Sequence, residues 1–150
     1  MTTSPPLLLV EDSKDDIVLM KLALKKAGIK NPLHIVNDGP EAIEYVTGSG
    51  AFADRENYPL PALIFLDLKL PLMSGHEVLM WIRKRDHLSS TVIVVLTASE
   101  NPEDLRRASR LGAHSYLVKP STAQELADQL LEMAKAFNWH WLGCGEFAPA

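Results

Sequence analysis

The chain has little cysteine, no long hydrophobic run and no block of basic residues. Its 150 residues include one cysteine, Cys144, so no intrachain disulfide can form and we expect a reducing, intracellular setting. The first apolar run stops at Glu11 and no basic region precedes it, which argues against a signal peptide and a membrane span. A formal net charge of −4 gives no field that would attract nucleic acid. These absences predict a cytoplasmic protein that binds neither nucleic acid nor membrane.

Hydrophobic residues make up 47% of the chain, which suits one globular domain with a sizeable core. Short apolar runs alternate with segments of helical periodicity, the pattern of a parallel sheet covered by helices on both faces. We expect strands at residues 7–10, 33–36, 62–66, 92–96 and 115–118. We expect helices at residues 14–27, 40–47, 75–85, 102–111 and 122–141. The pattern predicts a single α/β domain over residues 1–150, a doubly wound five-stranded parallel sheet.

Charged residues follow three of the expected strands. Glu11 and Asp12 close the first, Asp67 closes the third, and Lys119 follows the fifth. The carboxyl ends of parallel strands meet at one edge, where carboxylates can hold a divalent cation and a lysine can pair with a phosphoryl oxygen. An acidic pair directly closing an apolar strand has no packing or capping reason, and burying it unpaired would cost free energy. These residues predict a phosphoryl-transfer site.

The first expected helix begins with a different acidic cluster. Ser13 is in position to cap it, and Gly28 is in position to end it. Asp15 and Asp16 then fall in the first turn, where negative charge stabilises a helix. We interpret both as capping residues.

With these motifs in the same order, the sequence resembles the receiver domain of two-component response regulators. The matching positions are Glu11-Asp12, Asp67, Thr97-Ala98 after the fourth strand, and Lys119-Pro120. The resemblance covers residues 7–137 and leaves residues 138–150 as an aromatic extension. It implies the strand order 2-1-3-4-5, with the site beyond the carboxyl ends of the strands.

The resemblance also implies the chemistry of each site residue. Asp67 would be the nucleophile that becomes an acyl phosphate. Asp12 would bind Mg²⁺ directly, Glu11 through water, and Lys69 through its backbone carbonyl. Lys119 would pair with a phosphoryl oxygen, and it precedes a proline whose peptide bond is usually cis in this family.

A second group of residues would respond to the phosphoryl group. The resemblance assigns Thr97 to sensing it and Tyr116 to a switch that moves inward as the threonine moves. Lys69 and Ser99, each two places beyond a site residue, would tune the lifetime of the acyl phosphate. Taken alone, Thr97 and Tyr116 are also residues that a strand accommodates well. Gly75 would allow the tight return into the third helix.

Two other classes of protein are disfavoured. Phosphatases of the haloacid dehalogenase type also use an aspartate nucleophile after a strand, but they need a second aspartate where this chain has Lys69. A flavin-binding module would need small backbone donors in the first turn, where this chain has Glu11 and Asp12.

The rest of the chain bears on partners. Residues 48–61 form a connection longer than the usual ~2 to 6 residues, either a functional loop or a tolerated surface insertion. This loop and the tryptophan-bearing C-terminus resemble small regulators that partner phytochrome-type histidine kinases. Too little chain follows Phe137 for an output domain, so we expect output through the receiver's own surface. The resemblance implies that this surface is the face of the fourth helix, fifth strand and fifth helix, which carries Arg106, Arg107 and Arg110.

The last expected helix carries one apolar stripe as far as Trp141. An overhanging end would place aromatic side chains in solvent as a homodimer contact, and the alternative is that these rings fold back on the domain. The residues concerned are Phe137, Trp139 and Trp141, together with Trp81 from the third helix.

Overall fold

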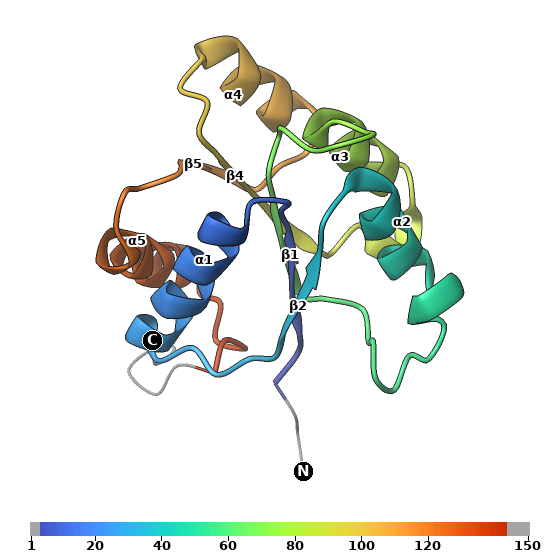
Figure 1. Cartoon of the computed structure of the whole chain (residues 1–150), viewed down its shortest axis with the longest axis horizontal. Coiled ribbons are helices and arrows are strands. Elements are labelled where there is room, and N and C mark those ends of the chain that lie inside the picture. The colour runs from blue at the N-terminus through green and yellow to red at the C-terminus, as the bar shows by residue number, and fades with distance from the viewer. Residues whose placement is uncertain (1–3, 144–150) are drawn as a thin grey trace.

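The structure is a computed structural model that describes residues 4–143. Its strands are β1 (Leu7–Val10), β2 (Leu33–Val36), β3 (Leu63–Leu66), β4 (Val92–Thr97) and β5 (Ser115–Val118). Its helices are α1 (Lys14–Ala27), α2 (Gly39–Thr47), α3 (Gly75–Arg83), α4 (Pro102–Arg110) and α5 (Ala123–Ala136), with short 3-10 helices η1 (Gly50–Phe52) and η2 (Asp86–Leu88). Strands and helices alternate as the sequence predicts (Figure 1).

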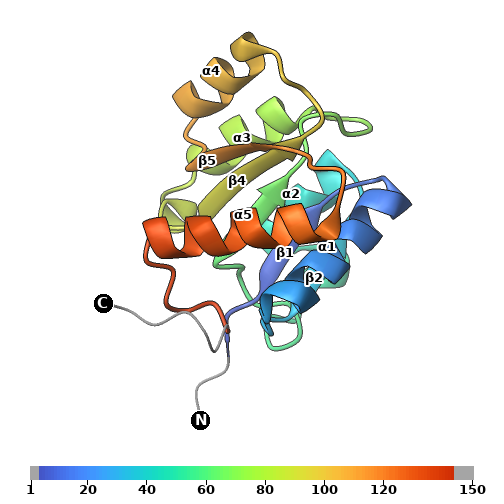
Figure 2. The ribbon, with the colours of Figure 1, turned by 90° about the vertical axis from the view of Figure 1, so that its left-hand side faces the viewer.

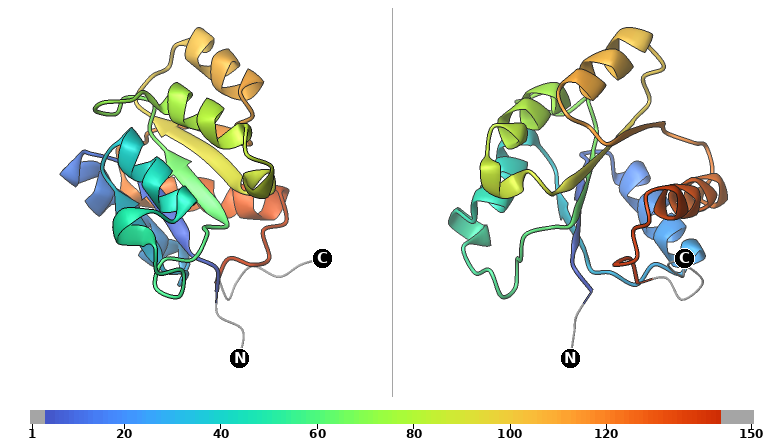
Figure 3. Two further views of the ribbon diagram at one scale, coloured as in Figure 1. Left: turned by 90° about the vertical axis from the view of Figure 1, so that its right-hand side faces the viewer. Right: turned by 180° about the vertical axis from the view of Figure 1, so that it is seen from behind.

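The five strands form one parallel sheet in the order β2-β1-β3-β4-β5, as predicted. Helices α1 and α5 cover one face of it (Figure 2), and α2 and α3 cover the other (Figure 3). Alternate residues of a strand point to opposite faces, so Leu7 and Leu9 join the core under α1 and α5. Leu8 and Val10 join the core under α2 and α3. Burial on both faces explains why the inner strands β1 and β3 are uninterrupted apolar runs.

The first helix begins and ends at the residues that the sequence indicated. The Ser13 hydroxyl accepts a hydrogen bond from the backbone N–H of Asp16 at 3.3 Å. Gly28 ends the helix at φ +73°, and its N–H bonds to carbonyls of the last turn. This capping fixes the start of α1 beside the acidic pair that closes β1.

The last helix is shorter than predicted, and the expected overhang is wrong. Helix α5 ends at Ala136, and Asn138 has φ +54°, a left-handed conformation that asparagine tolerates. The reversal turns Trp139 and Leu142 into the core beside α1 and α5, where each is 6% exposed. Folding back buries a large ring that an extended helix would leave in water.

Asn31 holds this returning segment in place. Its side-chain amide donates to the backbone carbonyls of Pro5 at 2.8 Å and Trp141 at 3.2 Å, and its carbonyl oxygen accepts from Gly143 N–H. One buried side chain thereby joins both ends of the described chain to the start of β2. Cys144 lies outside the described residues.

The sequence suggested that the aromatic residues of the third and last helices form one surface, but they lie in two places. Phe137, Trp139 and Trp141 stack on one another, with ring centroids 5.4 and 5.9 Å apart along the series. Trp81 packs instead against the core on the opposite face of the sheet, with the Arg85 guanidinium 3.6 Å from its ring centroid. Helical periodicity could not show on which side of the sheet each ring would lie.

The long connection at residues 48–61 folds back on the domain. Arg55 donates to the carbonyls of Tyr45, Val46 and Tyr58 at 2.7 to 2.9 Å. Tyr45 is fully buried, and its hydroxyl donates to the carbonyl of Pro59 at 3.0 Å. The connection is therefore anchored at several points along its length.

Candidate functional site

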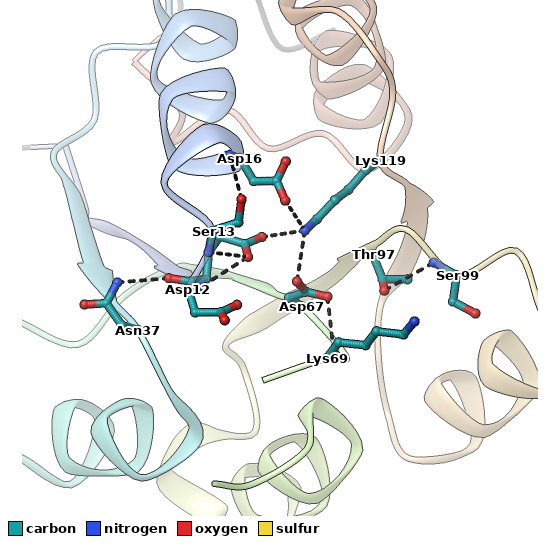
Figure 4. Close-up of polar contacts among 10 residues, drawn as sticks. Asp12, Ser13, Asp16, Asn37, Asp67, Lys69, Thr97, Ser99 and Lys119 are labelled. Carbon is teal, nitrogen blue, oxygen red and sulfur yellow. Dashed lines mark hydrogen bonds and ion pairs between the residues drawn. The ribbon is translucent and has the colours of Figure 1, made fainter. Parts of the chain in front are cut away.

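The predicted site residues meet at the carboxyl edge of the sheet (Figure 4). The last residues of β1 and β3, Val10 and Leu66, are register partners, so Glu11 and Asp67 leave neighbouring strands at the same level. Lys119 reaches this edge from β5, and its backbone N–H donates to the Thr97 carbonyl at 2.7 Å. The topology thus brings together residues that are far apart in the sequence.

Three carboxylates surround the ammonium of Lys119. Its Nζ lies 2.6 Å from Asp16 Oδ2, 2.7 Å from Glu11 Oε1 and 2.9 Å from Asp67 Oδ2. The Lys119 side chain is only 13% exposed, and an ammonium has three N–H donors. All three donors therefore have an acidic partner.

Glu11, Asp12 and Asp67 form a group suited to a metal ion. One carboxylate oxygen from each lies within 4.8 Å of the others. Glu11 and Asp67 are buried, whereas Asp12 is exposed, so the group has two fixed ligands and one open side. Carboxylate oxygens are the ligands that Mg²⁺ and Mn²⁺ prefer, and these residues fit such an ion.

The fold also fixes the backbone around these carboxylates. The Glu11 carboxylate accepts from the N–H groups of Asp12 and Ser13, both at 3.1 Å. The Asp67 carboxylate accepts from the N–H of Lys69 at 3.2 Å, and the Lys69 residue itself is exposed. These bonds hold each carboxylate at the carboxyl end of the strand that precedes it.

The electrostatics of the group reflect burial and crowding of negative charge. Burial is the main reason why the pKa of Glu11 is raised to about 7. The bond to Lys119 lowers this pKa, and the nearby charge of Asp67 raises it. Burial alone would lower the pKa of Lys119, but its bonds to Asp16, Glu11 and Asp67 outweigh this and raise that pKa. The ammonium therefore stays charged, while Glu11 titrates near neutral pH.

Thr97 and Tyr116 are linked through Ser99. Thr97 is fully buried, and its hydroxyl accepts a long hydrogen bond of 3.4 Å from Ser99 N–H. The Tyr116 hydroxyl donates to the Ser99 carbonyl at 3.0 Å. The Ser99 hydroxyl in turn donates to Asp104 Oδ2 at 2.6 Å. Ser99 thus joins both predicted switch residues to the first turn of α4.

The sequence suggested two features of the backbone near the site, a glycine-dependent turn at Gly75 and a cis bond after Lys119. A Cβ at Gly75 would lie 2.2 Å from the Asp67 carbonyl oxygen, so only glycine lets α3 start this close to the site. No cis peptide bond occurs among residues 4–143, so the expected cis bond after Lys119 is wrong and the bond is trans.

Asp16 is the site residue that the sequence interpretation missed. Its position in the first turn of α1 satisfied a capping explanation, and its N–H does bond to the cap Ser13. Its carboxylate nonetheless points to Lys119, which lies 103 positions further along the chain. The only signal in the sequence was an acidic residue one turn beyond the acidic pair.

The family model described as the response regulator receiver domain matches residues 7–131. The chain belongs to the response regulator receiver family. The 150 residues hold one receiver, which takes a phosphoryl group on an aspartate, and the family implies a sensor histidine kinase as partner. No separate catalytic domain accompanies it among these residues, and no helix in residues 4–143 is long and apolar enough to cross a membrane.

Known receivers align with this one over most of its length. Response regulator Rcp1 of Synechocystis is 37% identical over 93% of this chain and 92% of its own. The Mn²⁺-bound structure of Rcp1 superposes with a TM-score of 0.75 at 35% identity, covering 97% of this chain and 99% of that one.

Two further solved structures are close. RPA3017, a response regulator in red light signalling of R. palustris, gives a TM-score of 0.81 at 29% identity, covering 87% of this receiver and 91% of its own chain. The phosphorylated cyanobacterial phytochrome response regulator RcpA gives 0.79 at 32% identity, covering 89% and 93%.

Proposed function

We propose that Asp67 is the phosphoacceptor of this receiver. Asp67 is buried, with 6% of the residue exposed, and its carboxylate bonds to Lys119. The same carboxylate belongs to the acidic group suited to a metal ion, and this combination carries the proposal. A carboxylate oxygen of Asp67 attacks the phosphorus of a phosphohistidine in line. The new O–P bond forms as the N–P bond breaks, and the electron pair stays on the departing imidazole.

The metal of this reaction is proposed to be Mg²⁺. Glu11, Asp12, Asp67 and the backbone carbonyl of Lys69 would hold it, with water completing the octahedral set that Mg²⁺ requires. When bound, the ion neutralises carboxylate charge and the charge that develops on the phosphoryl oxygens. Lys119, whose Nζ lies 2.9 Å from Asp67 Oδ2, supplies a second positive charge and would orient one phosphoryl oxygen.

The kinase is proposed to be of the phytochrome type. The support is that RcpA is described as a phytochrome response regulator and RPA3017 acts in red light signalling. Both resemble this chain over most of its length. Transfer from a phosphorylated phytochrome kinase at a rate well above that from an unrelated histidine kinase would test this assignment.

Output is proposed to pass through the surface of α4, β5 and α5. Thr97 would turn toward the phosphoryl group, weakening its long bond to Ser99, and Tyr116 would move with the loop to which its hydroxyl bonds. Arg106, Arg107 and Arg110 are exposed on α4, where a partner would sense the change. A homodimer through α5 is one proposed reader, tested by size-exclusion chromatography with and without beryllofluoride.

Lys69 and Ser99 are proposed to set the lifetime of the acyl phosphate. Lys69 lies two residues beyond Asp67 and Ser99 two residues beyond Thr97, each donating its backbone N–H to that residue, and neither offers a strong general base to activate water. A slow loss of the phosphoryl group follows. Substitution of either residue should change the decay rate measured by intact-protein mass spectrometry, and unchanged decay in both would contradict the assignment.

Incubation with Mg²⁺ and acetyl phosphate tests the central proposal. We expect one phosphoryl group on the wild type, none on Asp67→Asn, and much slower addition to Lys119→Met. Addition to Asp67→Asn at the wild-type rate would show that another residue is the acceptor. Circular dichroism of each variant shows whether it is folded.

A further inference from the structure

Asp16 differs from the other two carboxylates that contact Lys119. Glu11 and Asp67 belong to the acidic group suited to a metal ion, and Asp16 does not. Its contact with Lys119 is also the shortest of the three, at 2.6 Å. Asp16 is therefore the one partner of the ammonium that neither the metal nor the phosphoryl group would occupy.

Occupation of the site changes what Lys119 can bind. A metal ion draws on the oxygens of Glu11 and Asp67, and phosphorylation consumes a carboxylate oxygen of Asp67. A lysine has a long, flexible side chain whose orientation is lost when its partners are withdrawn. One fixed acidic partner would keep the ammonium beside Asp67 in that state.

We infer that Asp16 is a positioning residue for phosphoryl transfer, holding the Lys119 ammonium beside Asp67 while metal and phosphoryl group engage Glu11 and Asp67. This inference rests on the proposed function. It assigns Asp16 no contact with the phosphoryl group.

The fold keeps Asp16 in place for this role. It lies in the first turn of α1, where its N–H is capped by Ser13, and α1 packs against α5, which follows Lys119 in the chain. Its side chain is 33% exposed, so it lies at the rim of the site and not beneath it. A short polar side chain on a capped helix loses little freedom in holding a long one.

Asp16 could instead slow phosphoryl transfer, so the direction of the rate change in an Asp16 variant distinguishes the two effects. Asp16 carries negative charge close to an incoming anionic phosphoryl group, so its removal could speed transfer by reducing repulsion. Positioning predicts that loss of the carboxylate slows transfer. Repulsion predicts that both the loss and the neutralisation of the carboxylate accelerate it.

The experiment compares phosphorylation by acetyl phosphate, with acetate as the leaving group, in wild type, Asp16→Ala and Asp16→Asn. We expect Asp16→Ala to react about tenfold more slowly, the effect of one charged hydrogen bond. Asp16→Asn keeps an acceptor oxygen without the charge and should be intermediate. The Mg²⁺ dissociation constant, measured by calorimetry without phosphodonor, should change less than about twofold. A general distortion of the site would weaken Mg²⁺ binding as well.

Two further variants complete the design. Asp15→Ala removes the neighbouring acidic side chain of the same helical turn, which is exposed, and should react as the wild type does. In a Lys119→Met background, adding Asp16→Ala should have little further effect, because the two residues act as a unit.

Each outcome decides the question. Unchanged or faster reaction of Asp16→Ala, or an equal slowing by Asp15→Ala, would overturn the inference while the proposed function stands. Absence of any phosphoryl group on the wild type would overturn the proposed function and, with it, the role of Asp16.

Discussion

At the scale of single residues, the site places one ammonium among four carboxylates. Lys119 contacts Asp16, Glu11 and Asp67, and Asp12 completes the acidic group. One positive charge does not neutralise four negative charges. Burial raises the pKa of Glu11, and the nearby charge of Asp67 raises it further. A divalent cation would remove much of the repulsion, which is why the geometry favours metal-dependent chemistry.

The pKa of Glu11 predicts how metal affinity varies with pH. Because this pKa is about 7, Glu11 carries a proton below neutrality and must release it to bind a metal ion. The apparent Mg²⁺ affinity should therefore fall about tenfold between about pH 8 and about pH 6, and calorimetry at each pH measures it. Glu11→Gln should bind more weakly with a nearly flat profile. A steep profile in that variant would assign the proton to another group.

Gly75 predicts a steric limit beside the phosphoacceptor. A Cβ there would meet backbone atoms of Asp67 and Leu68 at 2.2 and 2.6 Å, so neither neighbour can move aside cheaply. Gly75→Ala should lower the free energy of unfolding by about 2 kcal/mol or more, measured by urea denaturation. Gly28→Ala is the comparison, because its Cβ meets nothing within 4 Å and only its φ of +73° costs about 1 kcal/mol. Equal losses would contradict the steric account.

At the scale of elements, the end of α5 is the main difference from the sequence-based prediction. The apolar stripe that suggested a longer helix is real, but its last members reach the core through the turn at Asn138. Periodicity identifies residues that prefer burial, and it does not tell a continuing helix from a segment that folds back.

Trp139 and Phe137 give a direct test of that turn. Trp139 is 6% exposed and Phe137 is 49% exposed. Trp139→Ala should cost about 3 kcal/mol of unfolding free energy, and Phe137→Ala less than about 1 kcal/mol. Urea denaturation of both variants checks this. The reverse order would favour the extended helix that the sequence suggested.

Arg55 predicts the importance of the anchored connection at residues 48–61. Replacing it with alanine removes the guanidinium hydrogen bonds to the carbonyls of Tyr45, Val46 and Tyr58. We expect a loss of about 2 to 3 kcal/mol and faster hydrogen exchange over the connection. Arg106→Ala is the control, because Arg106 pairs with Glu103 at an exposed position and its loss should cost less than about 0.5 kcal/mol. A small effect at Arg55 would mean that the ring contacts among Tyr45, Phe52 and Tyr58 hold this segment without it.

At the scale of the whole molecule, the sequence predicted the fold and the meeting of Glu11, Asp12 and Asp67 at one edge of the sheet. Short apolar runs buried on both faces, and acidic residues at their ends, follow from simple rules for parallel sheets. The sequence did not reveal the side-chain geometry across the site. Asp16 bonds to Lys119 only because β1, β3 and β5 end at one edge, a contact that spans 103 positions and leaves no local pattern.

Mapping the phosphoryl group to a single residue shows whether Asp67 is the phosphoacceptor. Borohydride reduces an aspartyl phosphate to homoserine, so peptide mass spectrometry after treatment with Mg²⁺, acetyl phosphate and borohydride identifies the modified position. We expect homoserine at position 67 and no reduction at the other acidic residues of the site, with no conversion when a chelator removes the metal. Conversion at Glu11, Asp12 or Asp16 in place of Asp67 would contradict it.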